Sequence, residues 1–250
     1  MHPRCGSTRL ALAMHPIQPE TLALGFIWYA VFLFSTTCHE AAHALAAKLG
    51  GDPTAFHGGQ VTLNPIPHIR REPVGTVVAP ILSYLFGGWM IGWASAPYDP
   101  TWQQRYPRRA AWMALAGPAA NFLLVLAAAA AIRIGMALGH FRVPTMVSFT
   151  RITESTQAVS PTFATTLLSV FFVLNLLLGT FNLLPVPPLD GNTGVTLIMS
   201  KRAALKFLDW TQHSGFGLLG LVVAWVIFGR IFHSIFRLAF LALYPEAALR

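Results

Sequence analysis

The chain has 250 residues, of which 54% are hydrophobic and only 10% are charged, and its formal net charge is +8. A soluble domain carries about 25% charged residues, so this composition excludes an ordinary soluble protein and indicates one embedded in a membrane. The Lys and Arg residues stand in short clusters beside apolar runs, which is typical of membrane topology and of contact with anionic headgroups. We therefore expect a lipid bilayer around the chain and no nucleic acid as a partner.

A polar, proline-broken tail over residues 1–20 precedes the first of five apolar stretches. Its apolar patch Leu10–Met14 is too short for the hydrophobic region of a signal peptide, so the stretch that follows is expected to be a retained span. The five stretches are Thr21–Leu49, Val74–Ala96, Ala110–Leu138, Thr162–Pro187 and Phe216–Tyr244.

The first stretch contains the motif HEAAH, from His39 to His43. Positions i and i+4 of a helix lie on one face, so both imidazoles can reach one metal ion, and Glu40 between them can act on a water that the metal binds. Cys38 points away from His39 on a helix and is expected to be a packed thiol. Ionisable residues inside a membrane are usually functional, so we favour metal-dependent water chemistry over two packed histidines and an unrelated glutamate.

The second stretch, Val74–Ala96, contains Pro80 and the pair Gly87-Gly88, which favour a broken or re-entrant path over a straight crossing. The Gly- and Pro-rich segment before it contains the alternating residues Gln60–Leu63, which predict a short strand.

Parity supports three crossings by the first, third and fourth stretches. The C-terminal ends of the first and fourth then emerge on the same side, where His39 and His43 can meet a polar motif around Asp190. The side with more Lys and Arg is expected to be cytoplasmic, and it receives nine such residues against four. The nine are Lys48, Arg70, Arg71, Arg105, Arg108, Arg109, Lys201, Arg202 and Lys206, and the four are Arg4, Arg9, Arg142 and Arg151.

A catalytic zinc needs three protein ligands and an open position, and Asp190 is the candidate for the third ligand. It closes the segment FNLLPVPPLDGN, in which three prolines must break the fourth helix and Gly191 allows a sharp turn. Irregular backbone at membrane depth is tolerated only where it lines a protein cavity or water. The alternative is that Asp190 is a plain N-cap for a helix that begins near Asn192.

The last stretch carries Arg230, His233 and Arg237 on one helical face. We expect a helix that enters the membrane as far as Phe228 and then becomes amphipathic at the interface. The alternative is a polar stripe that faces other helices.

The sequence resembles the site-2 protease family of intramembrane zinc metalloproteases, in its compact form without PDZ or CBS domains. The resemblance runs from about Thr21 to Met199 and rests on the segments HEAAH, LGGDPTA, GQVTLNPIPHI, ALAGPAANFLL and FNLLPVPPLDG. It implies an all-α polytopic membrane protein with a three-helix catalytic core, a membrane-associated β-like or re-entrant segment at residues 50–97, and an additional C-terminal helix. The expected division is a tail at 1–20, the protease core at 21–200, and a C-terminal membrane helix and tail at 201–250.

The resemblance also implies one zinc ion per chain, held by His39, His43 and Asp190, with Glu40 as the catalytic base. Asn121 and Asn182 match asparagines of the family's GPxxN and NLLP motifs and are expected to hold substrate backbone or the oxyanion, rather than only to join helices. His57 and His68 are expected to be surface or hydrogen-bonding residues. Two departures from the family, Asn192 in place of a second glycine and the charged run after His68, remove neither a ligand nor the base.

The expected activity is hydrolysis of peptide bonds in or near transmembrane helices of membrane proteins, with Gln60–Leu63 pairing with unwound substrate. The expected location is a bacterial or archaeal type of cell membrane, with the site nearer the cytoplasmic face. Two alternatives stay open: a zinc transporter, which needs a second metal-binding helix, and an inactive relative that binds membrane clients. The sequence does not predict an oligomeric state.

Overall fold

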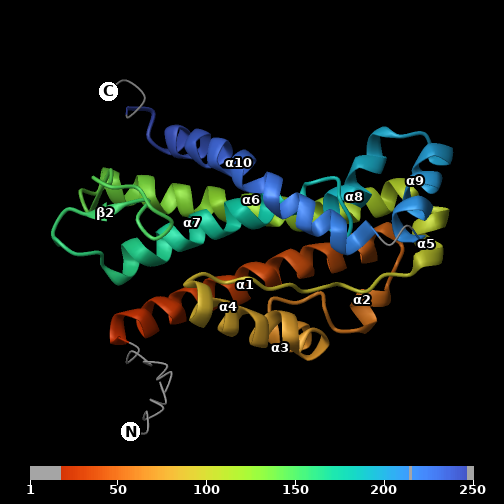
Figure 1. The fold of residues 1–250 in the computed structure, drawn as a ribbon, viewed down its shortest axis with the longest axis horizontal. Coiled ribbons are helices and arrows are strands. Elements are labelled where there is room, and N and C mark those ends of the chain that lie inside the picture. Colours follow the sequence, from red (N-terminus) through yellow and green to blue (C-terminus); the bar gives the residue numbers. More distant parts are fainter. Residues whose placement is uncertain (1–17, 214–215, 247–250) are drawn as a thin grey trace, which may run out of the picture.

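A computed structural model describes residues 18–213 and 216–246, and it is almost entirely helical. The polar tail expected at 1–20, with Arg4, Arg9 and the patch Leu10–Met14, lies outside the described residues up to position 17. Within the described part, four helices are long and apolar enough to cross a membrane (Figure 1). They are α1 (Pro19–Gly50), α6 (Pro107–Ala137), α7 (Phe163–Asn182) and α10 (Phe216–Leu243).

Local signals explain where these helices begin and end. α1 has Pro19 in its first turn and ends before Gly51, which has a φ of 96° that favours glycine. α7 begins with a capping box, in which the side chain of Thr162 accepts from the N–H of Thr165 and the Thr165 hydroxyl accepts from the N–H of Thr162. α6 continues through Pro118, a residue that transmembrane helices tolerate where neighbouring helices satisfy the freed backbone.

Helices α1, α6 and α7 pack against one another and form the three-helix core that was expected (Figure 1). One apolar cluster joins α6 and α7 to α10 through side chains such as Ile132, Phe172 and Phe228. A second cluster joins α1 to α7 through Trp28, Phe32 and neighbouring residues. The chain is therefore an all-α polytopic membrane protein, as predicted, and its only sheet in the described residues is a two-residue pair, β1 (Phe141–Arg142) with β2 (Glu154–Ser155).

The segment between α1 and α6 turns back on itself beside α1 (Figure 1). It contains α2 (Thr54–His57), α3 (Pro65–Arg71), the π-helix η1 (Val74–Val78) and α4 (Ala79–Gly87). After Gly88, at a φ of 73°, the chain returns without regular structure to α5 (Pro100–Arg105), at the same end of the bundle where α1 finishes. The apolar helix Val74–Gly87 is shorter than a span, and its path out and back beside α1 is the one expected of a re-entrant segment.

The strand expected at Gln60–Leu63 is not formed. Asn64 instead caps α3 by accepting from the N–H of Ile66, and Pro65 starts that helix one residue later. A strand needs a partner, and no strand in the described residues lies in this segment. The alternation of Gln60–Leu63 was therefore misleading, and the β-like character predicted for 50–97 is wrong.

Beyond the core, α8 (Asp190–Gly194), the 3₁₀ turn η2 (Val195–Ile198) and α9 (Lys201–His213) follow α7 and lie at the end of the bundle where α5 is found (Figure 1). In α10, Arg230, His233 and Arg237 are all exposed. The polar stripe therefore does not face other helices, which agrees with the interfacial interpretation.

The re-entrant path predicts how single cysteines react from the two sides of a membrane. In a background with Cys5 and Cys38 changed to Ser, the variants Arg70→Cys and Gln104→Cys should react with an impermeant maleimide from one side, and Val159→Cys from the other. The three positions are exposed, and only a crossing by Val74–Gly87 would separate the first two. Labelling of Arg70→Cys and Gln104→Cys from opposite sides would contradict the fold described here.

Candidate metal centre

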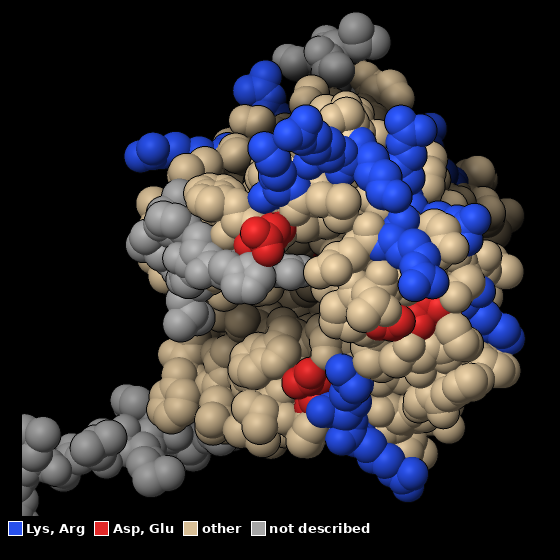
Figure 2. Space-filling model, turned by 90° about the vertical axis from the view of Figure 1, so that its right-hand side faces the viewer, with Lys and Arg blue, Asp and Glu red and all other residues tan. Residues whose placement is uncertain are grey.

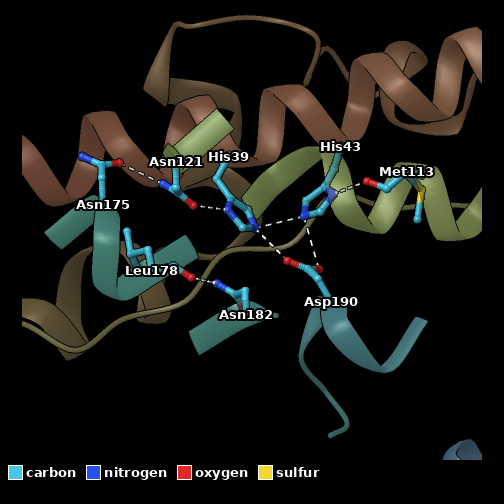
Figure 3. A network of polar contacts seen from close by, with 8 residues as sticks. All are labelled: His39, His43, Met113, Asn121, Asn175, Leu178, Asn182 and Asp190. Carbon is cyan, nitrogen blue, oxygen red and sulfur yellow. Dashed lines mark hydrogen bonds and ion pairs between the residues drawn. The ribbon is translucent and has the colours of Figure 1, made fainter. Parts of the chain in front are cut away.

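The two histidines of the HEAAH motif lie next to each other in the interior of the bundle (Figure 3). His39 and His43 are both 6% exposed, and their Nε2 atoms are 3.0 Å apart. They are four residues apart on α1, so the helix places both rings on one face. His43 lies seven residues before the end of α1, which puts the pair about 10 Å from that end at the helical rise per residue.

Asp190 reaches the same point from the broken chain after α7. Its Oδ2 is 3.0 Å from His39 Nε2 and its Oδ1 is 3.3 Å from His43 Nε2. α8 begins at Asp190 itself, with Leu189 at the N-cap and no side-chain cap, so the N-cap alternative is wrong. A Cβ on Gly191 would collide with the backbone of Leu183, so only glycine lets the chain fold back this tightly.

A backbone carbonyl fixes the tautomer of His43. Its Nδ1 lies 2.7 Å from the carbonyl oxygen of Met113 on α6. A carbonyl oxygen can only accept, so Nδ1 carries the hydrogen and the neutral ring presents a bare lone pair at Nε2.

A chain of buried amides fixes the tautomer of His39 in the same way (Figure 3). Asn175 on α7 donates from Nδ2 to the carbonyl oxygen of Phe171 at 2.8 Å and to Ser35 Oγ at 2.9 Å, so its Oδ1 faces Asn121. Asn121 therefore donates from Nδ2 to Asn175 Oδ1 at 2.9 Å, and its own Oδ1 accepts from His39 Nδ1 at 2.6 Å. Asn121 and Asn175 are fully buried, so this order cannot be exchanged with water.

The donor set fits a zinc ion. Two imidazole lone pairs and two carboxylate oxygens face one another within 3.0–3.3 Å, and all four are acceptors that repel unless a cation lies among them. Ligand atoms around a tetrahedral zinc, with bonds of about 2.0–2.1 Å, are roughly 3.3 Å apart.

Gly117 on α6 keeps the space beside the two rings open. A Cβ built on it would lie 2.5 Å from His39 Nε2 and closer still to His43 Nε2. Any larger residue would occupy the volume toward which both lone pairs point, so the close approach of α6 to α1 requires glycine here.

Glu40 is the acidic residue of this cluster. It is 6% exposed, and its carboxylate and the ring nitrogens of His39 and His43 lie within 4.8 Å of one another. Asp190 of α8 lies against the same two histidines. Among the described residues, His39, Glu40 and His43 form a group that could hold a metal ion. A second metal-binding helix, as a transporter would need, is not found in that part of the chain.

The remaining candidates are placed differently. Asn182, the last residue of α7, donates to the carbonyl oxygen of Leu178 at 3.0 Å and has no hydrogen bond to the ligands (Figure 3). His57 is exposed on α2, and buried His68 contacts the carbonyl oxygen of Thr62 through Nε2, so neither joins the metal cluster. Cys38 is a free thiol of intermediate exposure.

Sequence reasoning missed three contributors: Asn175, Gly117 and the carbonyl of Met113. Asn175 is a lone amide inside an apolar run, and this position could have indicated a functional role for it. The carbonyl of Met113 carries no signal in the side-chain sequence.

The candidate metal site consists of two histidines four residues apart, an aspartate from a second helix and a buried glutamate, inside a bundle of spanning helices. This is the arrangement expected of a membrane-embedded metallopeptidase. Comparison with known proteins gives the family. The model of peptidase family M50 matches residues 27–225, so the chain belongs to that family, the site-2 proteases.

Two relatives are similar over most of their length. The protein named "Putative zinc metalloprotease YwhC" of Bacillus subtilis is 30% identical over 195 residues, which cover 78% of this chain and 77% of the relative. The protein named "Putative zinc metalloprotease Rip2" of Mycobacterium tuberculosis is 30% identical over 211 residues, which cover 79% and 71%. No solved structure matches. The family and these relatives support a membrane zinc metallopeptidase.

The space at Gly117 gives a first prediction for this site. Gly117→Ala should lose zinc from the purified protein to the level of a His39→Ala variant, because the added methyl group meets both Nε2 atoms. Gly229→Ala is the matched control, since a Cβ there meets nothing within 4 Å. Metal content is measured by mass spectrometry, and full zinc in Gly117→Ala would contradict the geometry.

The buried amides give a second prediction. Asn175→Leu should weaken zinc binding about 10–100-fold, the usual effect of losing an outer hydrogen bond to a ligand, because Asn121 is then free to turn its amide. Asn182→Leu is the control and should keep wild-type affinity, since Asn182 bonds only Leu178. The visible spectrum of the Co²⁺-substituted protein should change in the first variant and not in the second. Equal affinity and spectra in both variants would remove Asn175 from the site.

Proposed function

We propose that this chain is an intramembrane zinc endopeptidase that hydrolyses peptide bonds in or near transmembrane helices of membrane proteins, with one zinc ion per chain. The observation that carries the proposal is the convergence of His39, His43 and Asp190 inside the spanning bundle, with both histidine tautomers set to present Nε2. Zinc bound there would supply a Lewis acid and a water of lowered pKa.

The residues of the chain supply the remaining chemistry. Glu40 is buried beside the ligands, where its carboxylate can take a proton from the attacking water and return it to the leaving amine. Asn121 acts through His39, because it accepts from that ring, donates to Asn175 and is fully buried, so that it is not exposed to substrate. Asn182 uses its nitrogen on Leu178, which leaves its oxygen available for a substrate N–H.

We further propose that the site lies nearer the cytoplasmic face of a bacterial or archaeal type of cell membrane. The end of the bundle next to the site carries the larger group of Lys and Arg residues, and such clusters mark cytoplasmic loops. A helical substrate hides its carbonyls in hydrogen bonds four residues apart, so a target helix must unwind near this end before cleavage.

Replacement of the proposed base tests the assignment. Glu40→Gln should lower cleavage of a reconstituted single-span substrate by at least about 10²-fold, because general acid–base catalysis is lost. Zinc content should stay at the wild-type level, since the three ligands are intact. Cleavage is followed in liposomes by appearance of the cut fragment, with chelated wild type as the metal-free control. Retained proteolysis in Glu40→Gln would refute the proposal, and zinc flux through such liposomes without cleavage would favour the transporter.

A further inference from the structure

The end of the bundle next to the metal centre is strongly basic. Figure 2 shows Lys and Arg side chains gathered in a band over this end, with Asp and Glu only as separate small patches. Within this band lies a cavity of about 330 Å³, between the start of α6 and the start of α9. Its lining consists of Arg105, Tyr106, Pro107, Arg108, Arg109 and Lys201.

The lining carries four cations and no carboxylate. None of the four takes part in an ion pair among the described residues. Asp99 is a carboxylate near this group, and its pKa is lowered first by hydrogen bonds from Thr101 and also by the charge of Arg105. Because four cations line the cavity and Asp99 lies outside its lining, the cavity keeps a net positive charge that favours an anion.

Part of the lining is held in place before any ligand arrives. The Arg109 guanidinium donates to the carbonyl oxygen of Gly50 at 3.1 Å and stacks 4.5 Å from the centre of the Tyr106 ring. Trp102 Nε1 donates to the same carbonyl at 3.1 Å. Two separate donors, one from α5 and one from α6, therefore hold the C-terminal end of α1, and Arg109 of the cavity lining is one of them.

The apolar surroundings indicate which anion fits. Trp112 follows Arg108 by one helical turn on the same face of the α6 span and is 63% exposed. Ile198, three residues before Lys201, is 86% exposed. Tryptophan at the end of a span is typical of the bilayer interface, so the cations lie at headgroup depth with apolar side chains next to them. A soluble phosphate compound would leave those apolar groups bare, whereas a phospholipid covers them with its acyl chains.

We propose that this cavity is a binding site for one anionic phospholipid, with the phosphate held by Arg105, Arg108, Arg109 and Lys201 and the acyl chains lying along Trp112. The site is separate from the metal centre and does not depend on the proposed protease activity. It joins α1 and α6 at Gly50, one turn from the Met113 carbonyl that orients His43, since Arg109 precedes Met113 by four residues.

Native mass spectrometry of the full chain in detergent tests the proposal, with phosphatidylglycerol and phosphatidylcholine as probes. Wild type should retain one phosphatidylglycerol in preference to phosphatidylcholine. The variant Arg105→Gln/Arg108→Gln/Lys201→Gln should retain it at least about tenfold less, because each cation near an anionic headgroup contributes about fivefold. Arg109 is kept, since it also supports Gly50.

The control variant Arg70→Gln/Arg202→Gln/Lys206→Gln removes three exposed charges from the same end but none from the cavity, and it should change retention less than about threefold. Zinc content and melting temperature show that both variants fold. If the triple variant does not fold, Lys201→Gln alone should lower retention about fivefold. Equal losses in both triple variants would reduce the site to a diffuse basic surface and overturn the proposal. The proposal would also be overturned if wild type retained phosphatidylglycerol and phosphatidylcholine equally. The same holds if glycerol phosphate displaced phosphatidylglycerol at the same concentration.

Discussion

The structure depends on four electron-pair acceptors that meet in a buried place: two imidazole nitrogens and two carboxylate oxygens within 3.0–3.3 Å. Such a group is unstable in a low-dielectric interior unless a cation lies among its members. The rings cannot turn to relieve this repulsion, because the Nδ1 hydrogen of each is already bonded. That of His43 is held by the carbonyl oxygen of Met113. That of His39 is held by Asn121, which is fixed through Asn175 by the carbonyl oxygen of Phe171. The backbone of α6 and α7 thus keeps both Nε2 atoms turned toward Asp190, which is the orientation that a metal site requires.

This requirement explains the close packing of the three core helices. α1 carries the two rings, and Gly117 on α6 must lie against them without a side chain, in a helix segment rich in small residues that let membrane helices approach. Asp190 can arrive only because α7 stops at Asn182 and the chain folds back on Gly191. Irregular backbone at this depth is tolerated since it lies within the protein.

Much of this arrangement could be predicted from the sequence, for physical reasons. The spacing of His39 and His43 places both rings on one face of a helix. Asp190 was the acidic residue at the point where prolines break the fourth apolar stretch. Parity and Pro80 predicted the re-entrant path. The alternation of Gln60–Leu63 failed because a strand needs a partner that local pattern does not reveal. Asn121 was expected to face substrate, but its orientation depends on Asn175, 54 residues away, and on a backbone carbonyl that no side-chain pattern encodes.

The length of the amide chain follows from the membrane itself. In a protein surrounded by hydrocarbon, a buried amide cannot form its hydrogen bonds with water. Each polar side chain beside the metal centre therefore needs a second polar group as its hydrogen-bond partner. The His39 ring requires Asn121, Asn121 requires Asn175, and Asn175 ends the chain at the Phe171 carbonyl and the Ser35 hydroxyl. Ser35 lies four residues before His39, so the chain closes on the helix from which it started. A loop of bonds through α1, α6 and α7 fixes the ring more firmly than one bond could, because no single member can turn alone.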